Sequence, residues 1–285
     1  MSLQPRARRL VAELSSRGIV AVRGPDWRGF LQGLLSQDVE NLAKGGLRFG
    51  ALLTPQGRLA CDLFILGEAD GCALDCAADR REALIQKLRL YRLRAKVEIE
   101  AADGSVRALY PGGGVPPDGG WAADPRLPTL GWRSLGEAAP PDAKPATEAD
   151  YTTFARGLGV PCAEDFGEEA TYPLEANLDL LNGIDFKKGC FVGQETTSRM
   201  KRRGQIKSRM VPIAFEGQPP SFGAELLAGD LRCGAALSGG EGLAMALLRL
   251  DRLDAGPLTM ADGRPWSPRW PAWFGDAPTS SEKKS

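Results

Sequence analysis

The stretch Asp185-Phe-Lys-Lys-Gly-Cys-Phe-Val-Gly-Gln-Glu195 carries a single cysteine between two glycines, Gly189 and Gly193. A glycine beside Cys190 allows a backbone conformation that a Cβ atom would hinder, and it leaves the thiol uncrowded. The positive charges of the two preceding lysines favour the thiolate over the thiol. These residue types leave two interpretations open: a reactive thiol on a turn, or a small apolar cysteine buried in a glycine-rich turn.

A basic tract follows this stretch, and no acidic residue lies between Glu195 and Glu216. Its cations are Arg199, Lys201, Arg202, Arg203, Lys207 and Arg209. A charge run of this kind is either a solvated face or an anion site for polyglutamate, phosphate or RNA. The pattern does not separate the two interpretations, so Arg199, Arg202 and Arg203 are candidate contacts for an anion or a partner.

The composition narrows the chemistry that is available. The chain has 285 residues, 43% of them hydrophobic, with 36 basic residues balancing 36 acidic ones. This is typical of a soluble globular protein, and any contact with nucleic acid or a membrane must be local. Histidine is absent, which excludes Ser-His-Asp and Cys-His nucleophilic sites and His-ligated zinc or haem. The chemistry must therefore use carboxylates, Lys, Tyr, Arg or Cys.

Six cysteines stand at positions 61, 72, 76, 162, 190 and 233, and none belongs to a Cys-x-x-Cys pair. Cys72 and Cys76 lack the spacing of zinc-finger ligands. Residues 1–14 contain no continuous apolar segment of the kind found in secretory signals. No run approaches the roughly eighteen apolar residues of a transmembrane helix. We therefore expect free thiols in a reducing cytoplasm, no membrane association and no stable metal site.

Hydrophobic spacing in the first hundred residues predicts a sheet with helices on one face. We expect a strand at 18–23, a helix capped by Asp26 that ends at 36–39, strands at 47–53 and 58–66 joined by a turn at 54–57, a strand at 72–77, a helix at 79–92 and a strand at 96–100.

Asp62 is a lone carboxylate in the second of the two hairpin strands, with apolar neighbours on both faces. An unpaired buried carboxylate is costly, so Asp62 either has a fixed partner or serves a ligand. A strand-end aspartate bound to backbone amides explains the spacing equally well.

Beyond residue 100 the pattern changes. Residues 111–150 are rich in loop-forming sequence and predict a compact connection with one or two short strands, followed by a helix at 148–158 capped by Thr147. Short strands at 208–215, 225–227, 232–238 and 242–250 predict a small β-barrel-like domain. We expect residues 266–274 to pack back on the body and residues 276–285 to be disordered.

The segment Lys188-Gly-Cys-Phe-Val-Gly-Gln-Glu195 closely resembles the KGC(Y/F)xGQE signature of the YgfZ family. This family includes the mitochondrial assembly factors for 4Fe–4S clusters and is related to the T protein of glycine cleavage (GcvT). Further matches follow in family order along nearly the whole chain. They are Phe30-Leu-Gln-Gly33, Gln37-Asp-Val39, Tyr91-Arg-Leu-Arg-Ala-Lys-Val97, Asp124-Pro-Arg126, Leu130-Gly-Trp-Arg133, Pro173-Leu-Glu-Ala-Asn177, Arg199 and Arg203-Gly204.

The resemblance implies an α+β fold: a GcvT-like folate-binding body over residues 1–205 and a C-terminal β-barrel domain over residues 206–275. The body would consist of two interlocked subdomains with a connection near 105–150, and a tetrahydrofolate pocket would run through its middle. The stretch around Asp62 matches the place where the T protein carries its catalytic aspartate, which contacts the reactive nitrogen of folate. Glu175 matches a region near the pterin end.

The function implied by the resemblance is maturation or repair of iron–sulfur proteins, with tetrahydrofolate as cofactor and Cys190 as the central thiol. Lys188, Gly189, Gly193, Gln194 and Glu195 would form its functional loop, in which Lys188 favours the thiolate and Glu195 fixes the loop. The expected partners are Fe–S client or carrier proteins. One thiolate cannot hold a 4Fe–4S cluster, which normally takes four cysteines. Cys190 would therefore be a transient ligand of a cluster shared with a partner.

Two alternatives remain open. The chain could be a tetrahydrofolate-dependent aminomethyl, or one-carbon, transferase with Asp62 as the acid or base at the folate nitrogen. The KGC motif belongs to the branch distinct from the T protein and favours a non-catalytic assembly factor instead. The chain could also be a folate-binding protein associated with tRNA modification. Direct nucleic-acid binding through residues 199–209 is not expected.

Overall fold

The computed structural model describes residues 9–113, 115–204 and 206–275, and the tail predicted to be disordered lies outside them. The chain divides into two compact units. The first takes in the described residues up to Pro55 together with Ala60–Tyr151 and Leu181–Gln194. The second takes in Gln56–Leu59, Thr152–Leu180 and the described residues from Glu195 onward. Within the described ranges, no helix has both the length and the apolarity that crossing a membrane requires.

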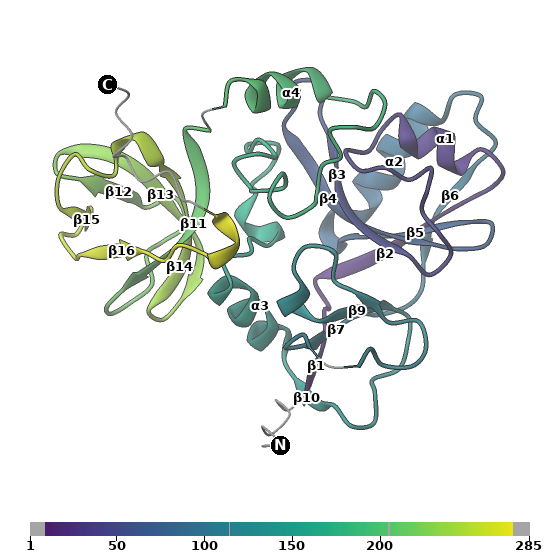
Figure 1. The fold of residues 1–285 in the computed structure, drawn as a ribbon, viewed down its shortest axis with the longest axis horizontal. Helices are drawn as coiled ribbons and strands as arrows, with labels where there is room; N and C mark the ends of the chain where they lie inside the picture. The colour runs from purple at the N-terminus through teal and green to yellow at the C-terminus, as the bar shows by residue number, and fades with distance from the viewer. Residues whose placement is uncertain (1–8, 114, 205, 276–285) are drawn as a thin grey trace. The chain divides into compact units, whose positions relative to one another are not determined.

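The first unit contains a sheet of strand order β3-β4-β5-β2-β6 (Figure 1). Its strands are β2 (Arg17–Arg23), β3 (Leu47–Leu53), β4 (Leu59–Gly67), β5 (Gly71–Ala77) and β6 (Glu98–Ala102). Helix α2 (Arg81–Arg92) packs on β2 and β6. Its buried side chains join those of the sheet in one hydrophobic core. These strands and this helix confirm what the hydrophobic spacing predicted.

The first helix is shorter than its apolar spacing predicted. Helix α1 spans only Trp27–Gln32, and its N-cap residue Asp26 makes no capping hydrogen bond. Asp26 instead accepts a hydrogen bond from the backbone N–H of Lys96 at 2.7 Å. Leu35 is buried outside the helix and forms an isolated bridge with Leu52. Burial against the sheet, not continued helix, explains the apolar spacing there.

A second sheet of the first unit has the strand order β10-β1-β7-β9-β8. Its strands are β1 (Leu10–Glu13), β7 (Val106–Tyr110), β8 (Ala122–Ala123), β9 (Trp132–Leu135) and β10 (Lys144–Ala146). Three of them lie within residues 111–150, where we predicted one or two, and β1 and β7 were not predicted. These strands have only two to five residues, which is too few to show the alternation typical of a strand. They form only by pairing with strands far along the chain, so local sequence does not reveal them.

The second unit contains an antiparallel sheet of order β15-β12-β13-β14-β11-β16. Its strands are β11 (Ser208–Phe215), β12 (Glu225–Ala228), β13 (Leu231–Gly240), β14 (Leu243–Arg249), β15 (Leu258–Met260) and β16 (Trp266–Pro268). An isolated bridge from Thr259 in β15 to Pro265 next to β16 brings the two edges together, so the barrel is nearly closed. Residues 266–274 were expected to pack on the body. Of these, residues 266–268 pair with β11 as a barrel strand, whereas Trp273 Nε1 donates to the carbonyl of Leu158 at 2.7 Å.

Two longer helices complete the fold. Helix α3 (Glu148–Gly157) begins as predicted, because the N–H of Asp150 donates to Thr147 Oγ1 at 3.1 Å. Helix α4 (Gln194–Arg202) was not predicted, since its sequence lacks a clear apolar stripe. Short 3₁₀ helices lie at Ala78–Arg80, Pro128–Leu130, Ala163–Asp165, Leu250–Arg252 and Ala272–Phe274.

Candidate functional site

Cys190 lies on the segment that leads into α4, and its thiol faces solvent. All six cysteines are free. Cys61, Cys72, Cys76 and Cys233 are buried, and Cys162 is half-buried. Burial raises the pKa of the Cys72 and Cys162 thiols above the ordinary value, which keeps them protonated. The exposed position of Cys190 excludes the interpretation of a buried apolar cysteine.

Lys188 anchors the segment that carries Cys190. Its Nζ donates to the backbone carbonyls of Gln32 at 2.8 Å, Leu35 at 2.5 Å and Gln37 at 3.0 Å. Carbonyls at and just after a helix end lack partners within the helix, and a cation there satisfies them and complements the helix dipole. All three ammonium hydrogens are used in this way. Lys188 is therefore an anchor, and its effect on the Cys190 thiolate remains a prediction.

Burial shifts the pKa of the Lys188 ammonium. Partial burial lowers the pKa of Lys188 to about 8, against the opposing attraction of Asp38, Asp185 and Glu40. The ammonium is thus held at neutral pH by three carbonyls and nearby acidic residues rather than by an ion pair with one partner.

A second set of hydrogen bonds joins the start of the same segment to the chain after α1. The backbone N–H of Asp185 donates to the carbonyl of Ser36 at 2.9 Å. Ser36 Oγ donates to the carbonyl of Gly183 at 2.6 Å, and Gln37 Nε2 donates to the carbonyl of Asn182 at 2.6 Å. The stem of the segment is therefore fixed, while Cys190 itself stays exposed.

The two glycines that flank Cys190 have different roles. Gly193 has φ of 77°, a conformation that residues with a Cβ atom rarely adopt. A Cβ atom added at Gly189 would meet no atom within 4 Å. The backbone freedom that we expected at Gly189 is therefore needed at Gly193, and Gly189 leaves open space beside the thiol.

Gln194 and Glu195 begin α4 and also differ. Gln194 Oε1 accepts from the backbone N–H of Phe191 at 3.4 Å, and the N–H of Gln194 donates to the carbonyl of Phe191 at 3.2 Å. Glu195 is exposed and accepts from Arg199 at 2.5 Å, one helical turn on. In the structure Gln194 closes the turn, which is the task that we expected of Glu195.

The basic tract is mostly exposed. Arg199, Lys201, Arg202, Arg203 and Lys207 all face solvent. Arg209 is buried: its guanidinium binds both carboxylate oxygens of Asp179, at 2.9 and 3.0 Å. Arg209 is thus a structural residue, and the exposed cations remain candidates for contact with an anion or a partner.

Asp62 is buried and has a fixed side-chain partner. Arg17 Nη1 donates to Asp62 Oδ2 at 2.9 Å, and Arg17 Nε donates to Asp75 Oδ1 at 2.6 Å. Arg133 Nε donates to the other oxygen of Asp75 at 2.6 Å. The alternative of a strand-end aspartate on backbone amides is therefore wrong. Asp75 had the same sequence signal as Asp62, a carboxylate inside an apolar strand, and that signal could have identified it.

A further buried ion pair, Asp124 with Arg126, lies beside the ring of Phe64. Arg126 binds both oxygens of Asp124, at 3.0 and 2.7 Å. The guanidinium carbons of Arg126 and Arg133 lie 4.8 and 3.9 Å from the centre of the Phe64 ring, within the range of cation–π attraction. We call this group the Phe64 cluster; it consists of Phe64, Arg17, Asp62, Asp75, Asp124, Arg126 and Arg133. Its three arginines balance its three aspartates.

Glu175 belongs to the second unit, whereas Asp62 belongs to the first. Glu175 Oε2 accepts from the backbone N–H of Tyr172 at 3.0 Å. Burial raises the pKa of Glu175, against the opposing effects of that N–H and of Arg58. Glu175 therefore keeps its proton to a higher pH than an exposed glutamate does.

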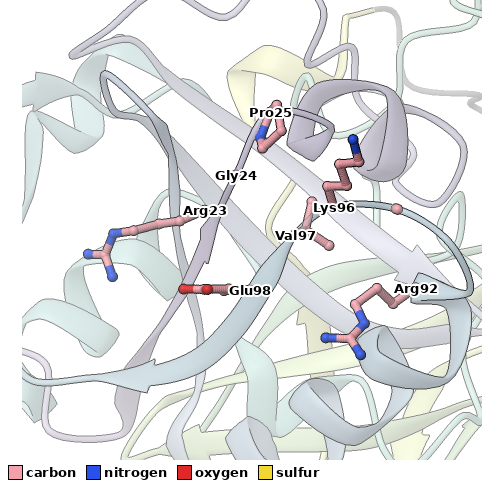
Figure 2. A pocket seen from close by; sticks show the side chains of 8 residues that line it. Arg23, Gly24, Pro25, Arg92, Lys96, Val97 and Glu98 are labelled. Atoms are coloured by element: carbon pink, nitrogen blue, oxygen red, sulfur yellow. The ribbon is translucent and has the colours of Figure 1, made fainter.

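Two other features bear on ligands. Among the described residues, no group of three or more Cys, Asp or Glu side chains is placed to hold a metal ion. A surface hollow of about 520 Å³ lies between the end of β2 and the start of β6 (Figure 2), and none of the predicted site residues lines it.

Comparison with solved structures defines the class of fold. The aminomethyltransferase T of the glycine cleavage system from Bartonella henselae superposes with a TM-score of 0.75 over 94% of this chain and 87% of that chain, at 18% identity. Residues 207–276 match the family model described as the CAF17 C-terminal beta-barrel domain. The protein therefore has the GcvT-like α+β fold with a C-terminal β-barrel, which confirms the fold class expected from the sequence.

Curated relatives define the family within that class. The human mitochondrial iron-sulfur cluster assembly factor IBA57 is 32% identical, over 86% of this chain and 78% of its own. The Pyricularia oryzae homolog is also 32% identical, over 84% and 71%. The Neurospora crassa homolog is 31% identical over 79% of this chain, which spans only 58% of that relative. This chain belongs to the IBA57 family of iron–sulfur cluster assembly factors, in agreement with the YgfZ-like resemblance of its motifs.

Proposed function

We propose that this protein acts in the maturation or repair of iron–sulfur proteins and that Cys190 is the side chain that meets the cluster or a partner thiol. The observation that carries the proposal is the exposure of Cys190 on an anchored segment. The other cysteines are buried or half-buried. Family membership supports the process, and the geometry supports the residue.

A cluster would be cargo shared with a partner protein. One thiolate supplies one of the four ligands that a 4Fe–4S cluster normally takes. No group of three or more suitable side chains among the described residues could supply the rest. We therefore expect a client or carrier protein to provide the remaining ligands, with the exposed cations Arg199, Arg202 and Arg203 available to contact it.

The test is complementation of a deletion strain, with the activities of 4Fe–4S enzymes as the readout. Cys190→Ala should leave those activities near the level of the deletion strain, while the purified variant keeps the thermal stability of the wild type. Cys162→Ala is the matched control, since Cys162 is the half-buried cysteine, and it should restore activity. Full restoration by Cys190→Ala would refute the thiol role.

We further propose that the protein binds tetrahydrofolate with Asp62 as a contact. Glu175, in the other unit, is a separate candidate for folate contact. Asp62 Oδ2 is occupied by Arg17. Its other oxygen accepts no hydrogen bond from the described residues and can accept one N–H from a ligand. This remaining acceptor fits a pterin ring, which has N–H donors.

Calorimetry with tetrahydrofolate tests this second proposal. Asp62→Asn keeps an acceptor for Arg17 but removes the charge, and it should weaken binding about tenfold or more. Asp70→Asn, which changes an exposed carboxylate on the same unit, should bind as the wild type does. Equal affinity of Asp62→Asn and wild type would remove Asp62 from the folate contacts.

The same purified variants and complemented strains also test the transferase and tRNA-modification alternatives. Turnover of an aminomethyl donor that is lost in Asp62→Asn would favour the transferase alternative over the assembly factor. A loss of tRNA modification that follows the loss of 4Fe–4S activity would make the link to tRNA indirect. Six free thiols suit a reducing compartment, and we keep the cytoplasm as the proposed location.

A further inference from the structure

The connection from α2 to β6 contains a strained leucine. The backbone N–H of Ala95 donates to the carbonyl of Arg92 at 2.8 Å, which closes a four-residue turn. Leu93 is the second residue of that turn, with φ of 44° and ψ of −106°. Glycine is the usual residue at this position because a Cβ atom is crowded there. A leucine at Leu93 therefore strains the backbone, where a glycine would not.

The strained leucine is also exposed to solvent. The side chain of Leu93 is 88% exposed, and Leu90, three residues earlier, is 75% exposed. The other leucines of α2, Leu84 and Leu88, are buried in the core. A single exposed leucine is ordinary on a protein surface. Two exposed leucines next to one another, one of them in a conformation that disfavours leucine, point to a contact surface.

Cations surround the two leucines. Arg92, Arg94 and Lys96 are all exposed. The dipole of α2 accounts for a cation in its last turn, but Arg94 and Lys96 lie beyond the helix end. No acidic residue lies between Glu82 and Glu98. The corner is therefore apolar at its tip and positively charged around it.

The hollow of about 520 Å³ adjoins this corner (Figure 2). Its lining is Arg23, Gly24, Pro25, Arg92, Ala95, Lys96, Val97 and Glu98. Arg23 is already paired with Glu100 at 3.1 Å, so Arg92 and Lys96 supply most of the positive charge that a ligand would meet. Glycine is required at position 24 in this lining, because a Cβ atom there would lie 2.3 Å from the carbonyl oxygen of Lys96.

We propose that residues 90–96 and this hollow dock an acidic segment of a partner protein that carries at least one large apolar side chain. Leu90 and Leu93 would contact the apolar side chain, and Arg92, Arg94 and Lys96 would pair with the acidic ones. A hollow beside the leucines suits a protruding side chain better than the flat surface of an anionic membrane. The inference concerns a surface distinct from the Cys190 segment and stands independently of the role proposed for that thiol.

Site-specific photo-crosslinking identifies the occupant. A photoreactive amino acid is placed at position 90 of the full chain in the cells that make it, and the crosslinked peptide is sequenced by mass spectrometry. The expected product is one acidic, apolar-bearing protein segment. The matched control is the same amino acid at position 222, because Phe222 is 61% exposed but lies in the second unit.

Binding measurements with that segment, made as a synthetic peptide, complete the test. Leu93→Gly and the double variant Arg92→Glu, Arg94→Glu should each weaken binding at least tenfold. Leu93→Gly should melt at or above the wild-type temperature, since glycine relieves the strain, so its loss of binding could not come from unfolding. Products that are only lipid, nucleic acid or a second copy of the chain would overturn the proposal. So would products no different from position 222, or unchanged peptide affinity in Leu93→Gly.

Discussion

Asp62 and Cys190 are both candidate functional residues, and their surroundings are opposite. Asp62 lies in the Phe64 cluster, where every charged side chain is buried and has an oppositely charged partner. Cys190 is exposed, and the bonds that fix its segment are made by Lys188, Ser36 and Gln37 with backbone carbonyls. In the cluster the candidate residue is itself part of the framework. In the segment, the residues that fix the backbone are different from the residue that carries the reactive sulfur.

This difference predicts where substitutions act. A change in the Phe64 cluster leaves a buried charge without its partner and lowers the stability of the whole fold. A change of Cys190 removes an exposed side chain and should alter function alone. Lys188 lies between these cases, because it is buried in part and supports a segment rather than the core.

The largest expected effect is that of Asp75→Asn. Burial alone would raise the pKa of Asp75, but the guanidinium groups of Arg133 and Arg17 hold it below its ordinary value. Removing the charge takes from Arg133 its ion pair with Asp75 and leaves Arg17 with Asp62 alone, and the free energy of unfolding should fall by about 3–5 kcal/mol. Urea denaturation measures this. Asp70→Asn, at an exposed position, should change stability by less than about 0.5 kcal/mol. Equal stability of the two variants would show that the cluster is not a unit.

An intermediate effect is expected of Lys188→Met. Three carbonyls would lose their donor, and the local opening free energy of residues 183–193 should fall by about 2 kcal/mol. Hydrogen exchange of that segment should then speed up, and 4Fe–4S enzyme activity in complemented cells should fall toward that of Cys190→Ala. The matched control is Lys187→Met, because Lys187 is exposed and adjacent. If both methionine variants exchange alike, Lys188 is not the anchor.

The smallest effect near neutral pH is a dependence of stability on pH, because it develops only above about pH 8. Because the folded-state pKa of Lys188 is about 8 and its ordinary value is 10.5, the unfolded chain holds more protons between these values. The stability of the wild type relative to Lys188→Met should therefore rise gently from about pH 8 to pH 10.5. Denaturation curves of both proteins across this range measure the difference. A fall with pH would mean that the three carbonyls stabilise the charged ammonium more than burial destabilises it.

Local sequence predicted the elements with a strong period but not the contacts between distant residues. Strands β3 and β11 follow directly from apolar runs bounded by turn residues. The partner of Asp62 was not predicted, since Arg17 lies 45 positions away and nothing in its own neighbourhood marks it. The anchor of the Cys190 segment joins residues 156 positions apart. Its acceptors are backbone carbonyls, which every residue has, so no side-chain pattern could identify them.

The division of the chain between the two units has a consequence for how the protein is made. The first unit needs residues 181–194, and the second combines Gln56–Leu59 with the last described strands. A ribosome therefore releases most of the chain before either unit has all of its parts. Domains usually fold one after another during synthesis, but here neither unit can finish early. The chain after α1 must wait for Gly183 and Lys188 before its polar groups have their hydrogen-bond partners, so newly made chains should depend on chaperones more than chains with sequential domains do.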